Sequence, residues 1–278
     1  MAEGTKIEWA DDSWNPIRAV NLANQARGHY CVKISPGCRN CYAEALQVWP
    51  IGSRIRYAAQ DRDQVQLYLD EAALEQPLRR KRGRDIFPCS MTDLFLEHHA
   101  DAWIAAMFDV MYRASQHRYL VLTKRAERMF NFIVGRNGAG NNAFAFRNVW
   151  FGISAEDQER WAERAPYVDE MRRLGFNTWA SFEPLLTDID LGPCRVDWAV
   201  IGGESGFDAR PTVIGHIRQL LEQLQAAGTR TFVKQLGAKP VNREGEAHQV
   251  SHKKGGNMAE WPEDLRVRQA APLPVGEL

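Results

Sequence analysis

Six short apolar runs recur along the chain, and each ends in polar, charged or glycine residues. The runs occupy residues 85–89, 119–122, 149–153, 178–182, 198–201 and 231–233. Continuous apolar runs of this length are typical of strands that are buried on both faces of a parallel sheet. Helical patterns lie between some of the runs, and strands alternating with helices every ~25–35 residues predict βαβ units.

We therefore predict an α/β fold with a partial (β/α) TIM-type barrel over residues 1–237. Residues 238–278 are rich in Gly, Pro and charge and are expected to form a C-terminal extension packed on the barrel. Residues 1–30 are expected to be irregular. The patterns predict helices at residues 42–49, 62–76, 103–111 and 214–224.

Polar side chains follow each predicted strand. In a β/α barrel the carboxyl ends of the strands meet at one face, which carries the chemistry. A residue at such a position can also cap the next helix, so a structural role stays open for each one. The strand-end residues are Ser90, Thr92, Asp93, Lys124, Ser154, Glu156, Glu183, Gly202, Gly203, Glu204, Lys234 and Gln235.

Three of the five cysteines lie in one stretch, residues 29–44, at the spacing C-x6-C-x2-C: Cys31, Cys38 and Cys41. Converging thiolates bind zinc or an iron–sulfur cluster. Structural zinc needs four protein ligands, and His29 is the candidate for the fourth. Three thiolates suit a [4Fe–4S] cluster with one open iron. We favour the cluster over the zinc site and over three unrelated thiols.

The stretch resembles the cluster loop of radical S-adenosylmethionine (SAM) proteins. It is closer still to a phage-associated, radical-SAM-like family with three cysteines. The residues that carry the resemblance are Trp14-Asn15-Pro16, Cys31, Ser35 to Glu44, and the segments at 202–206, 234–237 and 260–268. One departure is visible, because residues 17–30 lengthen the gap between Pro16 and Cys31.

The resemblance implies an enzyme in which Cys31, Cys38 and Cys41 hold a [4Fe–4S] cluster. SAM is then the second cofactor, and an electron donor drives its reductive cleavage to a 5′-deoxyadenosyl radical. By position, Asp93 is the expected acceptor for the amino group of SAM. The candidate catalytic residues are Lys124, Glu183, Glu204 and Lys234. The candidate cofactor-binding residues are Ser90, Thr92, Asp93, Ser154, Glu156, Gly202, Gly203, Gln235 and Tyr42.

The charges balance, with 35 basic and 35 acidic residues, so a global attraction to nucleic acid is absent. The local exception is the basic run Arg79–Arg84, which is either a phosphate-contacting patch or a solvated loop. The sequence has no apolar stretch of about 18 residues and no secretory signal, and its odd cysteine count favours a reducing compartment. We expect a cytoplasmic protein without membrane contact.

A nucleic-acid base or nucleotide is the substrate that we favour, and a small metabolite or a peptide would fit the same cup. A partner protein is a candidate for completing the site. The alternatives are a zinc-stabilised (Cys3His) nucleic-acid-binding protein without catalysis and an iron–sulfur enzyme that does not use SAM. The segment His252–Gly256 is a further candidate for contact with anionic groups.

Overall fold

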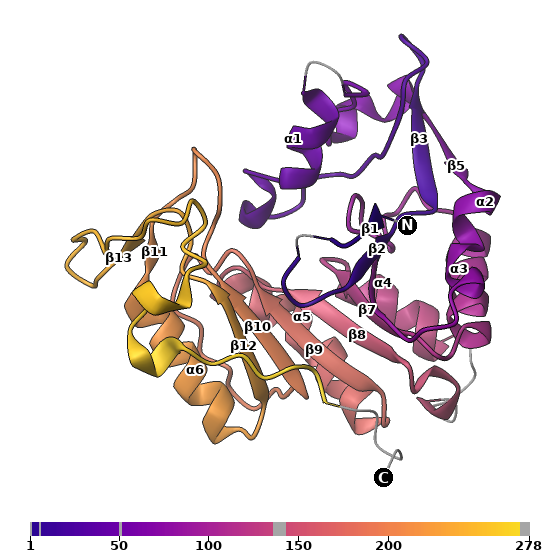
Figure 1. Ribbon diagram of the computed structural model, residues 1–278. Helices are drawn as coiled ribbons and strands as arrows, with labels where there is room; N and C mark the ends of the chain where they lie inside the picture. Colours follow the sequence, from indigo (N-terminus) through magenta and orange to yellow (C-terminus); the bar gives the residue numbers. More distant parts are fainter. Residues whose placement is uncertain (1, 6, 50–51, 136–142, 273–278) are drawn as a thin grey trace. The chain divides into compact units, whose positions relative to one another are not determined.

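The computed structural model describes residues 2–5, 7–49, 52–135 and 143–272 (Figure 1). The chain divides into two compact units. The first unit comprises residues 1–129 and 145–150, and the second comprises residues 130–144 and 151–278. No helix in the described ranges is long and apolar enough to cross a membrane.

The main sheet has eight strands in the order β1-β2-β6-β7-β8-β9-β10-β12. β1 pairs antiparallel with β2, whereas the pairs β2/β6, β6/β7, β9/β10 and β10/β12 are parallel. Strand follows strand in chain order, and β1 and β12 are the ends of the sheet. This is the mixed α/β topology of an open, partial β/α barrel. The bounds are β1 (Ala2–Glu3), β2 (Asp12–Trp14), β6 (Asp85–Pro88), β7 (Arg118–Thr123), β8 (Val149–Ser154), β9 (Asn177–Phe182), β10 (Trp198–Gly202) and β12 (Arg230–Gln235).

All six predicted apolar runs form strands of this sheet, so that prediction is confirmed. Every residue of β8 and β10 is buried. A strand buried on both faces has no polar face to alternate with, which is why these strands appear in the sequence as continuous apolar runs.

The helices of the second unit cover the sheet. α5 (Gln158–Arg173) packs on β9, and α6 (Ile214–Ala226) packs on β10 and β12. The buried face of α6 consists of the apolar residues spaced at three and four positions, as predicted. Gly228 follows α6 with a φ of +75°, a conformation that ends helices and favours glycine.

Four α-helices lie wholly or partly in the described residues of the first unit, together with a small second sheet. α1 (Tyr42–Val48) and α3 (Asp101–Arg113) confirm predicted helices, and α4 (Ala126–Phe130) begins in this unit. The predictions for residues 1–30 and 62–76 were wrong. β3 (Ile17–Asn21) pairs antiparallel with β4 (Arg27–Gly28) and β5 (Val65–Leu69), and only the short α2 (Glu71–Leu74) is helical within 62–76. In β5, Val65, Leu67 and Leu69 alternate with polar or amphipathic residues, which is strand periodicity.

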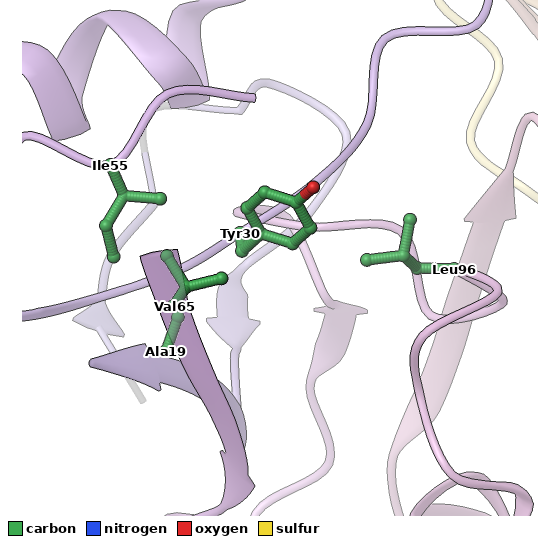
Figure 2. Packing of buried hydrophobic residues seen from close by; sticks show 5 residues of the cluster. All are labelled: Ala19, Tyr30, Ile55, Val65 and Leu96. Atoms are coloured by element: carbon green, nitrogen blue, oxygen red, sulfur yellow. The ribbon is translucent and has the colours of Figure 1, made fainter. Parts of the chain in front are cut away.

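The small sheet builds a hydrophobic cluster under the cysteine stretch. Figure 2 shows its members, which come from β3, β5 and three connecting segments. Cys31 and Val32 pack against this cluster. The extra residues 17–30 thus form the support on which the cysteine stretch begins. The members are Ala19, Tyr30, Ile55, Val65 and Leu96.

Residues 239–272 belong to the second unit, and their segment 267–269 covers the open edge of β12. The amide of Val233 donates to the carbonyl of Val267 (2.8 Å), and the amide of Gln269 donates to Thr231 (2.9 Å). The indole of Trp198 donates to the carbonyl of Gln269 (2.9 Å). An uncovered edge strand invites pairing with other chains, and this segment removes that hazard.

We predict that Leu220→Ala, on the buried face of α6, lowers the free energy of unfolding by about 2–5 kcal/mol, because it leaves a cavity against the sheet. Urea denaturation measures this change. The matched control is Glu222→Ala on the exposed face, for which we expect a change of about 0.5 kcal/mol or less. Equal effects of the two changes would contradict the packing of α6.

Candidate functional site

The cysteine stretch runs from the hydrophobic cluster, to which its Tyr30 belongs, into the first turn of α1. A 3-10 turn, Pro36–Cys38, leads to Cys41, which directly precedes α1. The hydroxyl of Ser35 lies 3.6 Å from the sulfur of Cys38. All three cysteines are free thiols of intermediate exposure.

Cys38 and Cys41 lie close enough to Cys31 to affect its ionisation. Burial raises the pKa of Cys31 to about 12; Asp93, Cys38 and Cys41 add to the rise, and Arg125 opposes it. Burial also raises the pKa of Cys41, against the effect of the backbone amides of Glu44 and Ala43. The described ranges contain no group of three or more His, Cys, Asp or Glu side chains placed to hold a metal ion. The donor set itself, three thiols in one short loop, is of the kind that an iron–sulfur cluster uses.

Glu44, the last residue of the cysteine stretch, closes it on itself. Its carboxylate forms an ion pair with Lys33 and accepts a hydrogen bond from the amide of Tyr57 (2.9 Å). The amide of Lys33 donates to the carbonyl of Tyr57. Glu44 therefore joins the two ends of the stretch that carries the cysteines.

The segment Ser90–Asp93, which follows β6, holds the cysteine stretch in place through hydrogen bonds, and we call it the docking segment. The hydroxyl of Tyr42 donates to the carbonyl of Ser90 (2.6 Å), and the hydroxyl of Tyr57 donates to that of Met91. The hydroxyl of Thr92 donates to the carbonyl of Tyr30, directly before Cys31. Ser90, Thr92 and Tyr42, predicted to bind cofactor, are thus brought together beside the cysteines, and each is engaged in docking.

The motif Trp14-Asn15-Pro16 holds the docking segment Ser90–Asp93 in place through the side chain of Asn15. The side-chain amide of Asn15 donates to the hydroxyl of Ser90 (3.0 Å), and its oxygen accepts from the amide of Met91 (2.9 Å). The indole of Trp14 donates to the carbonyl of Ala73 (2.8 Å). The motif therefore acts as a structural support for the segment that holds the cysteine stretch.

Asp93 is buried and already has a full set of partners. One carboxylate oxygen accepts from the amide of Phe95 (3.0 Å) and the hydroxyl of Thr123 (2.6 Å); the other accepts from the amide of Lys124 (2.9 Å) and from Arg125 (3.1 Å). Burial raises the pKa of Asp93, but Arg125 and these hydrogen bonds outweigh it and lower the pKa. In this arrangement Asp93 fixes protein groups, and the expected contact with SAM has no supporting geometry.

Arg125 connects Asp93 to the cysteine stretch. Its guanidinium also donates to Glu97 (2.7 Å) and to the carbonyl of Val32 (3.3 Å), the residue after Cys31. Sequence reasoning named Lys124 and missed Arg125, although both follow the same predicted strand. The signal that could have identified Arg125 is its place next to Lys124 at a strand end.

The other strand-end carboxylates lie in the second unit, and each has a basic partner. Glu156 and Arg164 form a pair at 3.4 Å, with side-chain exposures of 0% and 1%. Glu204 accepts hydrogen bonds from the amide and the guanidinium of Arg210. The carbonyl of Ser154 accepts from Arg164 (2.7 Å), so Ser154 and Glu156 both interact with the buried guanidinium of Arg164.

Glu183 and Lys234 form a pair in which both side chains are partly exposed, whereas Glu156 and Glu204 are buried. Their charged atoms lie 2.9 Å apart, and their side chains are 15% and 16% exposed. They come from strands on either side of β10. A Cβ atom on Gly202 of β10 would lie 2.7 Å from the carboxylate of Glu183, so the missing side chain leaves the space that the pair uses.

Gly203 is explained by close packing of the backbone. A Cβ atom there would lie 2.3 Å from the carbonyl oxygen of Leu236 and 2.4 Å from the hydroxyl of Thr212. The side-chain amide of Gln235 donates to the carbonyl of Gly203 (2.9 Å). The space beside Gly202 is occupied by Glu183, and the space beside Gly203 is occupied by Leu236 and Thr212. We had expected a ligand at these two glycines.

The basic run Arg79–Arg84 is largely used inside the first unit. Arg84 and Arg80 form ion pairs with the buried Asp12 (3.1 and 3.8 Å), and Arg79 pairs with Glu75. Lys81 and Arg82 are exposed. Arg79, Arg80 and Arg84 thus have structural partners, as the alternative of a loop between two elements predicts.

The geometry defines an α/β protein with a docked three-cysteine stretch at one strand end and paired charges at the others. The chain matches, over residues 4–262, the family model described as a protein of unknown function (DUF5131). Because this match covers most of its 278 residues, the chain belongs to that family. No curated protein and no solved structure matched the chain.

We predict that Arg125→Leu lowers the free energy of unfolding at neutral pH by about 3–5 kcal/mol, because it leaves the carboxylate of Asp93 buried without a cation. The lowered pKa of Asp93 contributes stability above the ordinary carboxyl pKa of about 4, and this contribution is lost as the pH falls through the folded pKa. Urea denaturation across acidic pH measures both effects.

The control for this prediction is the double variant Asp93→Asn with Arg125→Leu, which removes both charges. We expect it to be more stable than Arg125→Leu alone and to lose this acid dependence. A single variant that unfolds within about 0.5 kcal/mol of the parent would contradict the role of the pair.

Proposed function

We propose that this protein is a radical SAM-type iron–sulfur enzyme that acts on a nucleic-acid base. Cys31, Cys38 and Cys41 would hold a [4Fe–4S] cluster. When bound, the cluster and SAM supply the radical chemistry, while the protein supplies position and exclusion of water. The observation that carries the proposal is the stretch with three free thiols that is docked on the segment Ser90–Asp93.

The residues around the thiols fit this proposal as an outer shell. Metal ligands are oriented by the groups that hydrogen-bond to them and to their backbone. Here the hydroxyl of Thr92 donates to the carbonyl of Tyr30, directly before Cys31, and the guanidinium of Arg125 donates to the carbonyl of Val32, directly after it. We assign both residues to the orientation of Cys31, and we assign Asp93 to the orientation of Arg125.

Among the candidate catalytic residues, Glu183 and Lys234 are favoured by their partial exposure. A carboxylate and an ammonium group in contact can hold or transfer one proton between them. Glu204 is buried and held by Arg210, so we assign it to the structure of its loop. Five free thiols suit the reducing cytoplasm that we propose. An external electron donor completes the scheme.

We predict that anaerobic reconstitution with iron and sulfide gives a brown protein that bleaches with dithionite. Cys31→Ala, Cys38→Ala and Cys41→Ala should each lose the visible absorbance and most of the iron, because each removes one thiolate ligand. Cys194→Ala is the matched control and should retain both. A product assay for 5′-deoxyadenosine tests the use of SAM.

If the cluster forms but no 5′-deoxyadenosine appears with SAM and reductant, the protein is an iron–sulfur enzyme of another kind. If Cys194→Ala loses as much iron as the three variants, the assignment of ligands is wrong.

One observation favours a second candidate, a Cys3His zinc site in a nucleic-acid-binding protein. Both ring nitrogens of His29 are buried without a hydrogen-bond partner among the described residues. Burial lowers the pKa of His29 to about 4, with Arg18 and His99 adding to the effect. The imidazole is therefore neutral at pH 7, which is the form that binds zinc.

We predict that His29→Ala leaves the iron content and visible absorbance of the reconstituted protein nearly unchanged, because the cluster needs only the three thiolates. Elemental analysis of protein purified without added metal provides the comparison. One zinc per chain in the parent, absent from His29→Ala, would favour the second candidate.

A further inference from the structure

We infer that the second unit carries a contact surface for single-stranded nucleic acid, centred on Phe207 and flanked by lysines of the 237–255 segment. This inference deepens the proposed function, because it names the residues that would meet the nucleic-acid substrate. It rests on the exposure of Phe207, on the brace that holds its loop, and on the placement of Lys239, Lys253 and Lys254.

Phe207 is 94% exposed, the highest value among the large hydrophobic side chains of the described residues. It lies in the loop that leaves the carboxyl end of β10. Gly206, directly before it, has a φ of +109°, a conformation that favours glycine and turns the chain outward at this point. An aromatic ring in water contributes no burial to folding, so Phe207 is available for contact with a partner.

The loop that presents Phe207 is braced at its base. Glu204 accepts hydrogen bonds from the amide of Arg210 (2.8 Å) and from its guanidinium (2.9 Å), which joins the two ends of the loop. The amide of Ala209 also donates to the carbonyl of Gly206 (3.3 Å). A loop already held in one conformation loses less entropy when its tip binds.

Backbone hydrogen bonds place three lysines next to this base. The amide of Ala238 donates to the carbonyl of Glu204 (2.8 Å), and the amide of Gly237 donates to the carbonyl of Lys254 (3.1 Å). Lys239 and Lys253 are exposed, and Lys254 is partly exposed. Within the described ranges, the side chains of these lysines form no ion pair.

An exposed aromatic ring with neighbouring cations is the usual platform for single-stranded nucleic acid, because bases stack on the ring and phosphates meet the lysines. A single ring among polar residues lacks the continuous apolar area that a protein or membrane contact needs. The observations therefore favour a nucleic-acid strand.

The test uses the full chain without cluster and a short fluorescent single-stranded oligodeoxynucleotide at low salt, with anisotropy as the readout. Phe207→Ala should weaken binding by roughly 5- to 150-fold, the range for loss of one stacked base. Phe207→Trp, which keeps an aromatic ring at this position, should bind the oligonucleotide about as tightly as the parent. Tyr112→Ala, at another exposed aromatic in α3, is the matched control and should bind like the parent.

The lysines are tested through the salt dependence. Replacing Lys253 and Lys254 by Ala should reduce the slope of log K against log salt by about 1.4, the value for two phosphate contacts on a single strand. Replacing Lys81 and Arg82 in the first unit is the control and should leave the slope unchanged.

The inference is overturned if the parent binds no oligonucleotide at low salt, or if Phe207→Ala binds as tightly as the parent. Cys38→Ala should keep its oligonucleotide affinity while losing the cluster. A failure of the proposed chemistry is thereby distinguished from a failure of this surface.

Discussion

The buried pair of Asp93 and Arg125 is the interaction on which the rest of the first unit depends. It joins the segment after β6 to the segment after β7. Arg125 also donates to the carbonyl of Val32, the residue next to Cys31. A buried carboxylate without its cation is expensive, so the two residues must be present together. The position of the cysteine stretch thus follows from an ion pair that the spacing of the cysteines does not reveal.

The same arrangement recurs in the second unit, where Glu156, Glu183 and Glu204 each have a basic partner. A charged group at the end of a buried strand must be solvated or paired, and here pairing prevails. Polar strand ends are therefore a reliable sign of the sheet edge and a weaker sign of ligand contact. Partial exposure, which differs among the pairs, separates Glu183 from Glu156.

The six strands and three of the helices could be predicted because their cause is local. Buried parallel strands require continuous apolar runs, and α6 requires its apolar stripe. β5 could not be recognised as easily, because its pairing with β3 depends on residues 44 or more positions away. The partners of Asp93, Glu156 and Glu183 depend on the fold in the same way, as does the close backbone packing that requires Gly203.

The basic residues show why exposure and pairing matter more than local charge density. The run Arg79–Arg84 is the densest cluster of positive charge in the sequence, yet Arg80 and Arg84 neutralise Asp12, which lies far away in the chain. A guanidinium already paired with a buried carboxylate gains little from a phosphate, because the contact would compete with that pair. Lys239 is separated in sequence from the adjacent Lys253 and Lys254, but backbone hydrogen bonds bring both segments to the loop of Phe207. Cations beside an exposed ring can meet phosphate and base at the same time, so the more dispersed charges form the better candidate for nucleic-acid contact.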